Sequence, residues 1–139
     1  MKRISHELII PEIHKVEVDS NYDNVEKQLE EEIKERMDEG KVIKISSRLS
    51  KSKFKRKLGK DGVELLKNKY GLENGSLFEM ISNGVPDFLV YQNNEISFIE
   101  CKRNADGLSY SQIEWINKYQ DRFDIEIVYY VEEEWWKDE

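Results

Sequence analysis

The chain has little of several features that would place a protein in a specialised class. It contains one cysteine among 139 residues, which excludes an internal disulfide framework and suits a reducing compartment. It has no apolar run long enough to cross a bilayer, and no secretory hydrophobic region near its first residues. We therefore expect one intracellular domain that has no membrane partner.

Signatures of several common catalytic centres are missing as well. No cysteine–histidine cluster suggests a zinc site, and neither His6 nor His14 has an evident nucleophile as partner. The sequence has no serine-centred elbow, and "GKDG" lacks the full spacing of a phosphate-binding loop. These absences argue against a zinc enzyme, a serine hydrolase of the elbow type and a P-loop protein.

Charge is plentiful and unevenly distributed. Charged residues make up 37% of the chain and the formal net charge is −7, yet residues 41–70 hold eleven Lys and Arg against two acidic residues. The stretch "RLSKSKFKRKLGK" is interpreted as a loop whose cations contact the backbone phosphates of a polyanion, although an ordinary solvated surface would have the same composition. The candidate DNA contacts are Arg48, Lys51, Lys53, Lys55, Arg56, Lys57 and Lys60.

One helix is indicated clearly in the first half of the chain, within residues 19–41. Its apolar residues recur every four positions, and Gly40 follows them as a stop signal. Asp19, Ser20 and Asp23 are the candidate N-caps. The recurring apolar residues are Val25, Leu29, Ile33 and Met37.

The remaining elements follow from composition and turn signals. "KVIKISSRL" is predicted to be a strand, "KDGVELLKNKYG" a short helix and "SLFEMI" a strand, whereas residues 1–19 are ambiguous. "VPDFLVY" and "EISFIECK" are predicted strands of a tight hairpin, followed by the helix "SYSQIEWINKYQDRF" and the strand "DIEIVYYV". This order predicts an α/β domain with a mixed sheet, in which the last two strands run parallel.

The hairpin brings two acidic residues together. If residues 93–94 form the turn, Gln92 pairs with Glu95, and counting back along both strands places Asp87 opposite Glu100. Directly opposed residues point to the same face of a sheet, with Cβ atoms about 4.5–5.5 Å apart. The register therefore predicts two carboxylates side by side.

Lys102 should lie on the same face, because side chains alternate along a strand. Two opposed carboxylates repel each other unless a cation neutralises them, and hard oxygen ligands suit Mg²⁺. A neighbouring ammonium could then position an attacking water. An exposed sheet face with ordinary charges, in which Lys102 pairs with Glu100, is the alternative interpretation.

Three further residues are candidates for the same site. Glu26 falls inside the apolar stripe of the first helix, as an extra metal ligand or as part of a frayed first turn; Glu30 lies at the edge of that stripe. Gln112 completes a capping box with Ser109, but it also leads the helix face expected to pack on the sheet. The side chain of Cys101 should point away from the site, which leaves its backbone carbonyl available to a metal ion.

The stretch "GVPDFLVY…ISFIECKRNADGLSYSQ" resembles the core of PD-(D/E)XK nucleases, with Pro86-Asp87 and Glu100-Cys101-Lys102 as its two halves. It is most similar to the virus-type replication-repair nuclease (VRR-Nuc) group, in which Gly-x-Pro-Asp, Glu-x-Lys, Asp-x-Leu-Ser and Gln follow in this order. The resemblance covers residues 82–120. It leaves an N-terminal extension at 1–20 and a basic insertion at 50–75 without counterparts.

The resemblance implies a restriction-endonuclease-like αβββαβ core and hydrolysis of DNA phosphodiesters with Mg²⁺, for which Mn²⁺ would substitute. Asp87, Glu100, the Cys101 carbonyl and Glu26 would bind the ion. Lys102 would orient the attacking water, and Gln112 would orient a ligand or contact the DNA backbone.

Small members of this group resemble Holliday-junction resolvases, homodimers that cut branched DNA in repair and recombination. We therefore expect a branched-DNA endonuclease in the cytoplasm of a prokaryotic cell or a virus-infected host. A restriction-type or nicking nuclease of a mobile element, and a non-catalytic nucleic-acid-binding domain, are the alternatives. Trp135 and Trp136 either contribute to the dimer interface or fold back onto their own sheet.

Overall fold

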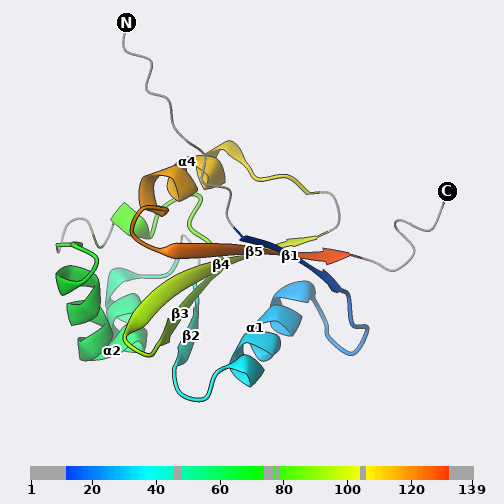
Figure 1. The fold of residues 1–139 in the computed structure, drawn as a ribbon, viewed down its shortest axis with the longest axis horizontal. Coiled ribbons are helices and arrows are strands. Elements are labelled where there is room, and N and C mark those ends of the chain that lie inside the picture. Colours follow the sequence, from blue (N-terminus) through cyan, green and yellow to red (C-terminus); the bar gives the residue numbers. More distant parts are fainter. Residues whose placement is uncertain (1–11, 46–47, 74–76, 78, 104–105, 132–139) are drawn as a thin grey trace, which may run out of the picture.

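A five-stranded mixed sheet forms the centre of the protein in the computed structural model, which describes residues 12–45, 48–73, 77, 79–103 and 106–131 (Figure 1). The strand order is β1-β5-β4-β3-β2. β1 and β4 run parallel to β5, whereas β3 pairs antiparallel with both β4 and β2. The mixed α/β class and the parallel pairing of the last two strands are confirmed. The strands are β1 (Glu12–Glu17), β2 (Lys41–Lys44), β3 (Phe88–Gln92), β4 (Glu95–Arg103) and β5 (Asp124–Val131).

The hairpin between β3 and β4 has the predicted register. Asn93 and Asn94 adopt φ angles of 52° and 58°, the left-handed pair that a two-residue type I′ turn requires. Gln92 therefore pairs with Glu95, and the ladder continues to the pair Phe88–Ile99. Asp87 and Glu100 are the next residues beyond that pair.

Helix α1 (Val25–Arg36) occupies the predicted segment, but its cap differs from the expected ones. Asn24 is the N-cap, and its side-chain oxygen accepts a hydrogen bond from the Lys27 amide at 2.9 Å. The predicted caps Asp19, Ser20 and Asp23 are wrong. Asp23 instead accepts a hydrogen bond from the Lys27 ammonium at 2.8 Å, an i,i+4 contact that stabilises the same first turn.

The basic segment is a helix, so its interpretation as a loop is wrong. Helix α2 (Lys51–Asn68) begins after the N-cap Ser50 and includes most of "KDGVELLKNKYG", the segment predicted as a short helix. Phe54, Leu58 and Leu66 are fully buried at helical spacing, and this apolar stripe explains why a lysine-rich sequence folds against the sheet. Gly59, with φ +83°, kinks the helix between its two halves.

The segment "SLFEMI" was predicted to be a strand, and this prediction is wrong. Of its described residues, Leu77, Glu79 and Met80 are helical and Ile81 lies in a bend. Leu77 and Met80 are both fully buried three positions apart, a spacing that suits one face of a helix better than alternate positions of a strand.

The helices cover both faces of the sheet. α1 packs on one face, whereas α2 and α4 (Tyr110–Tyr119) pack on the other; α4 lies above the sheet and α1 below it in Figure 1. None of the helices described here is long and apolar enough to cross a membrane. Trp135 and Trp136, the residues considered for a dimer interface, lie outside the described residues. The core on the α1 face contains Leu29, Ile33, Phe88, Val90, Ile99, Val128 and Tyr130.

Candidate active site

Asp87 immediately precedes β3, where backbone pairing fixes its position. Its carbonyl oxygen accepts a hydrogen bond from the Ile45 amide at 2.7 Å, which extends the contact between β2 and β3. Its carboxylate oxygen Oδ2 accepts a second hydrogen bond from the Cys101 amide at 2.8 Å. The Asp87 side chain is therefore directed across to β4, beside Glu100.

Glu100 is buried, with 4% of its surface exposed. Its Oε1 accepts a hydrogen bond from the Gln112 side-chain amide at 3.2 Å. Gln112 also completes the capping box of α4. Its Oε1 accepts a hydrogen bond from the Ser109 backbone amide at 2.9 Å, and its backbone amide donates to Ser109 Oγ at 3.2 Å. The two interpretations of Gln112 are thus compatible, because the cap holds the side chain that contacts Glu100.

The two carboxyl groups perturb each other. Burial, followed by the negative charge of Asp87, raises the pKa of Glu100 to about 9. Burial also raises the pKa of Asp87, although hydrogen bonds from Glu100 and the Cys101 amide oppose that effect. Glu100 therefore holds a proton at neutral pH and shares it with Asp87 in a hydrogen bond. A divalent cation would replace that proton.

Lys102 and Cys101 lie on opposite faces of β4. Lys102 follows the alternation of Phe98 and Glu100, and its positive charge opposes part of the rise in the pKa of both Asp87 and Glu100. The Cys101 side chain packs on the core of the α1 face, as predicted, and burial raises the pKa of its thiol. Its thiol is therefore a poor nucleophile.

Glu26 reaches the site from the other side of the sheet. A cavity of about 360 Å³ at the strand ends is lined by both Glu26 and Asp87. Glu30 instead pairs with Lys34 at 3.3 Å, so Glu26 is the helical carboxylate that faces Asp87 across this cavity. The Glu26 carboxylate contacts Lys44, whose ammonium lies 2.9 Å from Oε2.

The donor set of Asp87 and Glu100 fits a hard divalent cation. Both supply carboxylate oxygens, and the raised pKa of Glu100 reflects its burial and then the negative charge of Asp87 beside it. Glu26 does not complete a tight trio with them. Among the described residues, the group of three potential ligands whose atoms lie within 4.8 Å of one another is Glu12, His14 and Glu126, on β1 and β5.

The basic residues follow β2 in the chain. β2 ends at Lys44 beside the cavity, and α2 begins seven residues later at Lys51. Lys55 is half-buried, whereas the other six candidate DNA contacts are exposed. The structure therefore places most of these cations where a polyanion could reach them. The exposed six are Arg48, Lys51, Lys53, Arg56, Lys57 and Lys60.

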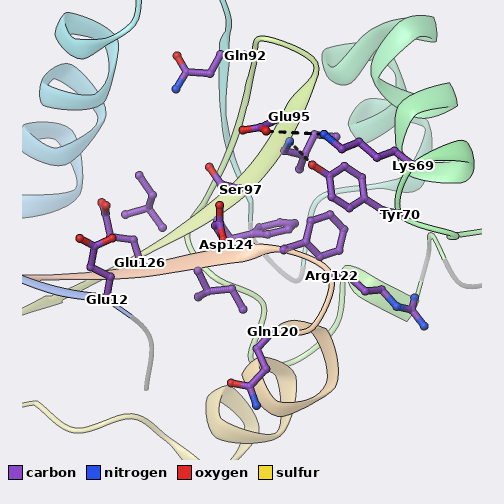
Figure 2. A pocket seen from close by; sticks show the side chains of 15 residues that line it. Glu12, Lys69, Tyr70, Gln92, Glu95, Ser97, Gln120, Arg122, Asp124 and Glu126 are labelled. Carbon is purple, nitrogen blue, oxygen red and sulfur yellow. Dashed lines mark hydrogen bonds and ion pairs between the residues drawn. The ribbon is translucent and has the colours of Figure 1, made fainter. Parts of the chain in front are cut away.

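A second cavity, of about 680 Å³, lies at the opposite end of the sheet, where β4 and β5 begin (Figure 2). Tyr70 closes part of it and accepts a hydrogen bond from the Ile96 amide at 2.9 Å. Its acidic lining residues outnumber the basic ones, so it does not suit a polyanion. The acidic residues are Glu12, Glu95, Asp124 and Glu126, against Lys69 and Arg122.

The sequence interpretation missed Lys44. The feature that could have indicated Lys44 is its position in β2 opposite Phe88, the residue after Asp87, which places it beside the site. That signal becomes visible only when the pairing of β2 with β3 is known.

A scan of protein-family models finds no match for this chain, and a search of curated proteins finds no similar sequence. The function of the chain is therefore inferred from the geometry of the site.

Gly84 allows the loop before β3 to lie directly against the first turn of α4. Its φ is +90°, and a Cβ at this position would overlap the Ser111 carbonyl and lie 2.8 Å from the Gln112 amide nitrogen. The same contact thus positions both the segment leading to Asp87 and the residue that contacts Glu100.

We expect Gly84→Ala to lower the free energy of unfolding by about 2 kcal/mol or more, since it adds both backbone strain and a steric clash. Urea denaturation would measure the change. Gly107→Ala is the control, because nothing lies within 4 Å of a Cβ there. Equal losses in the two variants would contradict the proposed contact.

The raised pKa of Glu100 predicts a pH-dependent stability. The folded protein binds this proton more tightly than the unfolded chain does, so stability falls as pH rises from the ordinary value of 4.5 towards about 9. In EDTA, we expect Glu100 to contribute a loss of up to about 1.4 kcal/mol per pH unit between pH 5.5 and 7.5.

Glu100→Gln should remove this component, and urea denaturation at several pH values would measure it. Glu95→Gln is a matched control on the same strand, because the Glu95 side chain is 70% exposed. If the wild type and Glu100→Gln show parallel pH profiles, the shared proton is excluded.

Proposed function

We propose that this protein is a Mg²⁺-dependent DNA endonuclease of the PD-(D/E)XK superfamily. The observation that supports this most directly is the placement of Asp87 and Glu100 side by side on adjacent strands, with Lys102 on the same face. Buried carboxylates in contact cost stability, and a purely nucleic-acid-binding domain has no use for them. A metal-dependent hydrolase uses all three groups.

The element order is compatible with this proposal. α1, β2, β3, β4, α4 and β5 follow one another in the αβββαβ order expected of a restriction-endonuclease-like core. α2 corresponds to the basic insertion, and β1 adds a strand beside β5. The site lies where β3 begins and β4 nears its end, so residues distant in sequence converge there.

Asp87 and Glu100 would hold the Mg²⁺ ion, with the backbone carbonyl of Cys101, the residue after Glu100, as a third oxygen. When bound, the ion supplies Lewis-acid stabilisation of the negative charge that develops on the phosphate. Mn²⁺ should substitute, because it accepts the same oxygen ligands. The proton shared by the two carboxyls must leave before the ion binds.

The remaining side chains would position the reacting groups and neutralise the charge that develops on the phosphate. Lys102 would orient the attacking water and stabilise the pentacovalent phosphate with its ammonium. Gln112 keeps the Glu100 carboxylate in place through its 3.2 Å hydrogen bond, while the capping box keeps Gln112 itself in place. Lys102 thus acts on the reacting groups, and Gln112 acts through Glu100.

The substrate we propose is branched DNA. Helix α2 presents its cations to the phosphate backbone, a contact that positions DNA without reading its sequence. Resolution of a four-way junction needs two symmetric cuts, so a homodimer with one site in each protomer is part of the proposal.

Cleavage assays with Mg²⁺ on matched linear, flap, fork and four-way-junction DNA would test this function. We expect Asp87→Asn and Glu100→Gln each to abolish cleavage while thermal unfolding shows equal or slightly greater stability, because either change removes the cost of keeping two acidic groups in buried contact. Glu95→Gln should cut normally. Cleavage by either site variant at the wild-type rate would rule out the metal site, and cuts confined to linear duplex would rule out branched DNA as substrate.

The basic helix makes a separate prediction. Neutralising Lys53, Arg56 and Lys57 with glutamine should weaken DNA binding for all sequences alike. If all three contact phosphates, it should flatten the log–log salt dependence by up to about 3 units. Binding would be measured in the Asp87→Asn background by fluorescence anisotropy at several salt concentrations.

A matched variant controls for net charge. Lys15, Lys27 and Lys34 lie on β1 and α1, away from α2, and their replacement with glutamine removes the same number of charges. The control should leave the slope close to that of the starting protein. If both triple variants change the slope equally, α2 is not the DNA contact.

A further inference from the structure

Lys44 is the last residue of β2, and its ammonium reaches the cavity that Glu26 and Asp87 line. The Lys44 Nζ lies 2.9 Å from Glu26 Oε2, within hydrogen-bonding distance. Glu26 and Lys44 come from α1 and β2, which follow each other in the chain, so the contact ties the first turn of α1 to the end of β2. The Lys44 ammonium therefore pairs with Glu26, the carboxylate that faces Asp87 across the cavity.

The surroundings of Lys44 are those of a bound cation. The hydrogen bond to Glu26 is the main cause that raises the Lys44 pKa, and the charges of Glu26, Glu30 and Asp87 contribute further. Of these carboxylates, Glu30 has a second partner in Lys34 at 3.3 Å. Lys44 therefore remains charged across the neutral pH range and balances negative charge on the Glu26 side of the site.

The contact with Lys44 also makes Glu26 a poor ligand for a metal ion. A divalent ion could bind Glu26 only by displacing the ammonium or by lying close to it, and both are unfavourable. Among the described residues, Glu26, Asp87 and Glu100 also do not form a group whose potential ligand atoms all lie within 4.8 Å of one another. Glu26 is thus better placed as the partner of Lys44 than as a ligand of the ion on Asp87.

We propose that Lys44 takes the place of a second metal ion, so that the centre binds a single divalent cation on Asp87 and Glu100. This inference rests on the proposed nuclease function and specifies its metal content. Many phosphodiester-cleaving sites use two ions to stabilise the attacking and leaving oxygens. Here an ammonium supplies the second positive charge at a fixed position, where it can also pair with a phosphate oxygen that Glu26 alone would repel.

Mn²⁺ binding measures this directly without any cleavage. Isothermal titration calorimetry and electron paramagnetic resonance would count the ions bound by each variant in the absence of DNA. All proteins would carry His14→Ala, so that the group formed by Glu12, His14 and Glu126 does not add an ion. Lys44 is 53% exposed, so its replacement should leave the fold intact, and circular dichroism would verify this.

We expect one Mn²⁺ in the starting protein, and its loss in Asp87→Asn. Lys44→Met should release Glu26 and raise the count to two, whereas Lys44→Met combined with Glu26→Gln should return it to one. Lys44→Arg keeps the cation and should also bind one.

Each other result is decisive. A starting protein that binds two ions, or a Lys44→Met variant that still binds one, would overturn the role of Lys44 and leave the nuclease proposal standing. A starting protein that binds no ion, or one ion that Asp87→Asn does not remove, would overturn the metal site and the role of Lys44 together.

Discussion

The mutual repulsion of Asp87 and Glu100 is the constraint on which the site depends. A two-residue turn at Asn93-Asn94 sets the register that brings them together, and the sheet then buries Glu100. Charge in such a position is costly unless hydrogen bonds and counter-charges compensate. The Cys101 amide, the Gln112 side chain and a shared proton provide part of that compensation. The remainder is what a divalent cation would supply.

Those features of the site that follow from local rules could be predicted from the sequence. The turn chemistry of Asn-Asn and the two-residue period of strands are sufficient to oppose Asp87 and Glu100. The capping box of Ser109 and Gln112 is equally local. The predicted caps of α1 were wrong because several residues in that stretch can cap, and only the final helix geometry selects Asn24.

Other features depend on tertiary packing. The stripe of Phe54, Leu58 and Leu66 was present in the sequence, but the lysines around it suggested a loop, and only the sheet supplies the surface that this stripe covers. The contact between Lys44 and Glu26 was less accessible still. A helical period gives the direction of Glu26, but not the strand that it meets, because the position of α1 on the sheet is set by Leu29 and Ile33.

The charges around the strand ends also explain how metal and DNA binding would depend on each other. Lys44 and Lys102 supply positive charge on either side of the carboxylate pair, but the pair itself would repel an incoming phosphate. An ion bound between them reverses that sign, so metal and DNA should each raise the affinity for the other by the same factor, as linkage requires. In a chain whose net charge is −7, this local reversal would confine productive DNA binding by the proposed nuclease to the loaded site, while α2 would supply the general attraction.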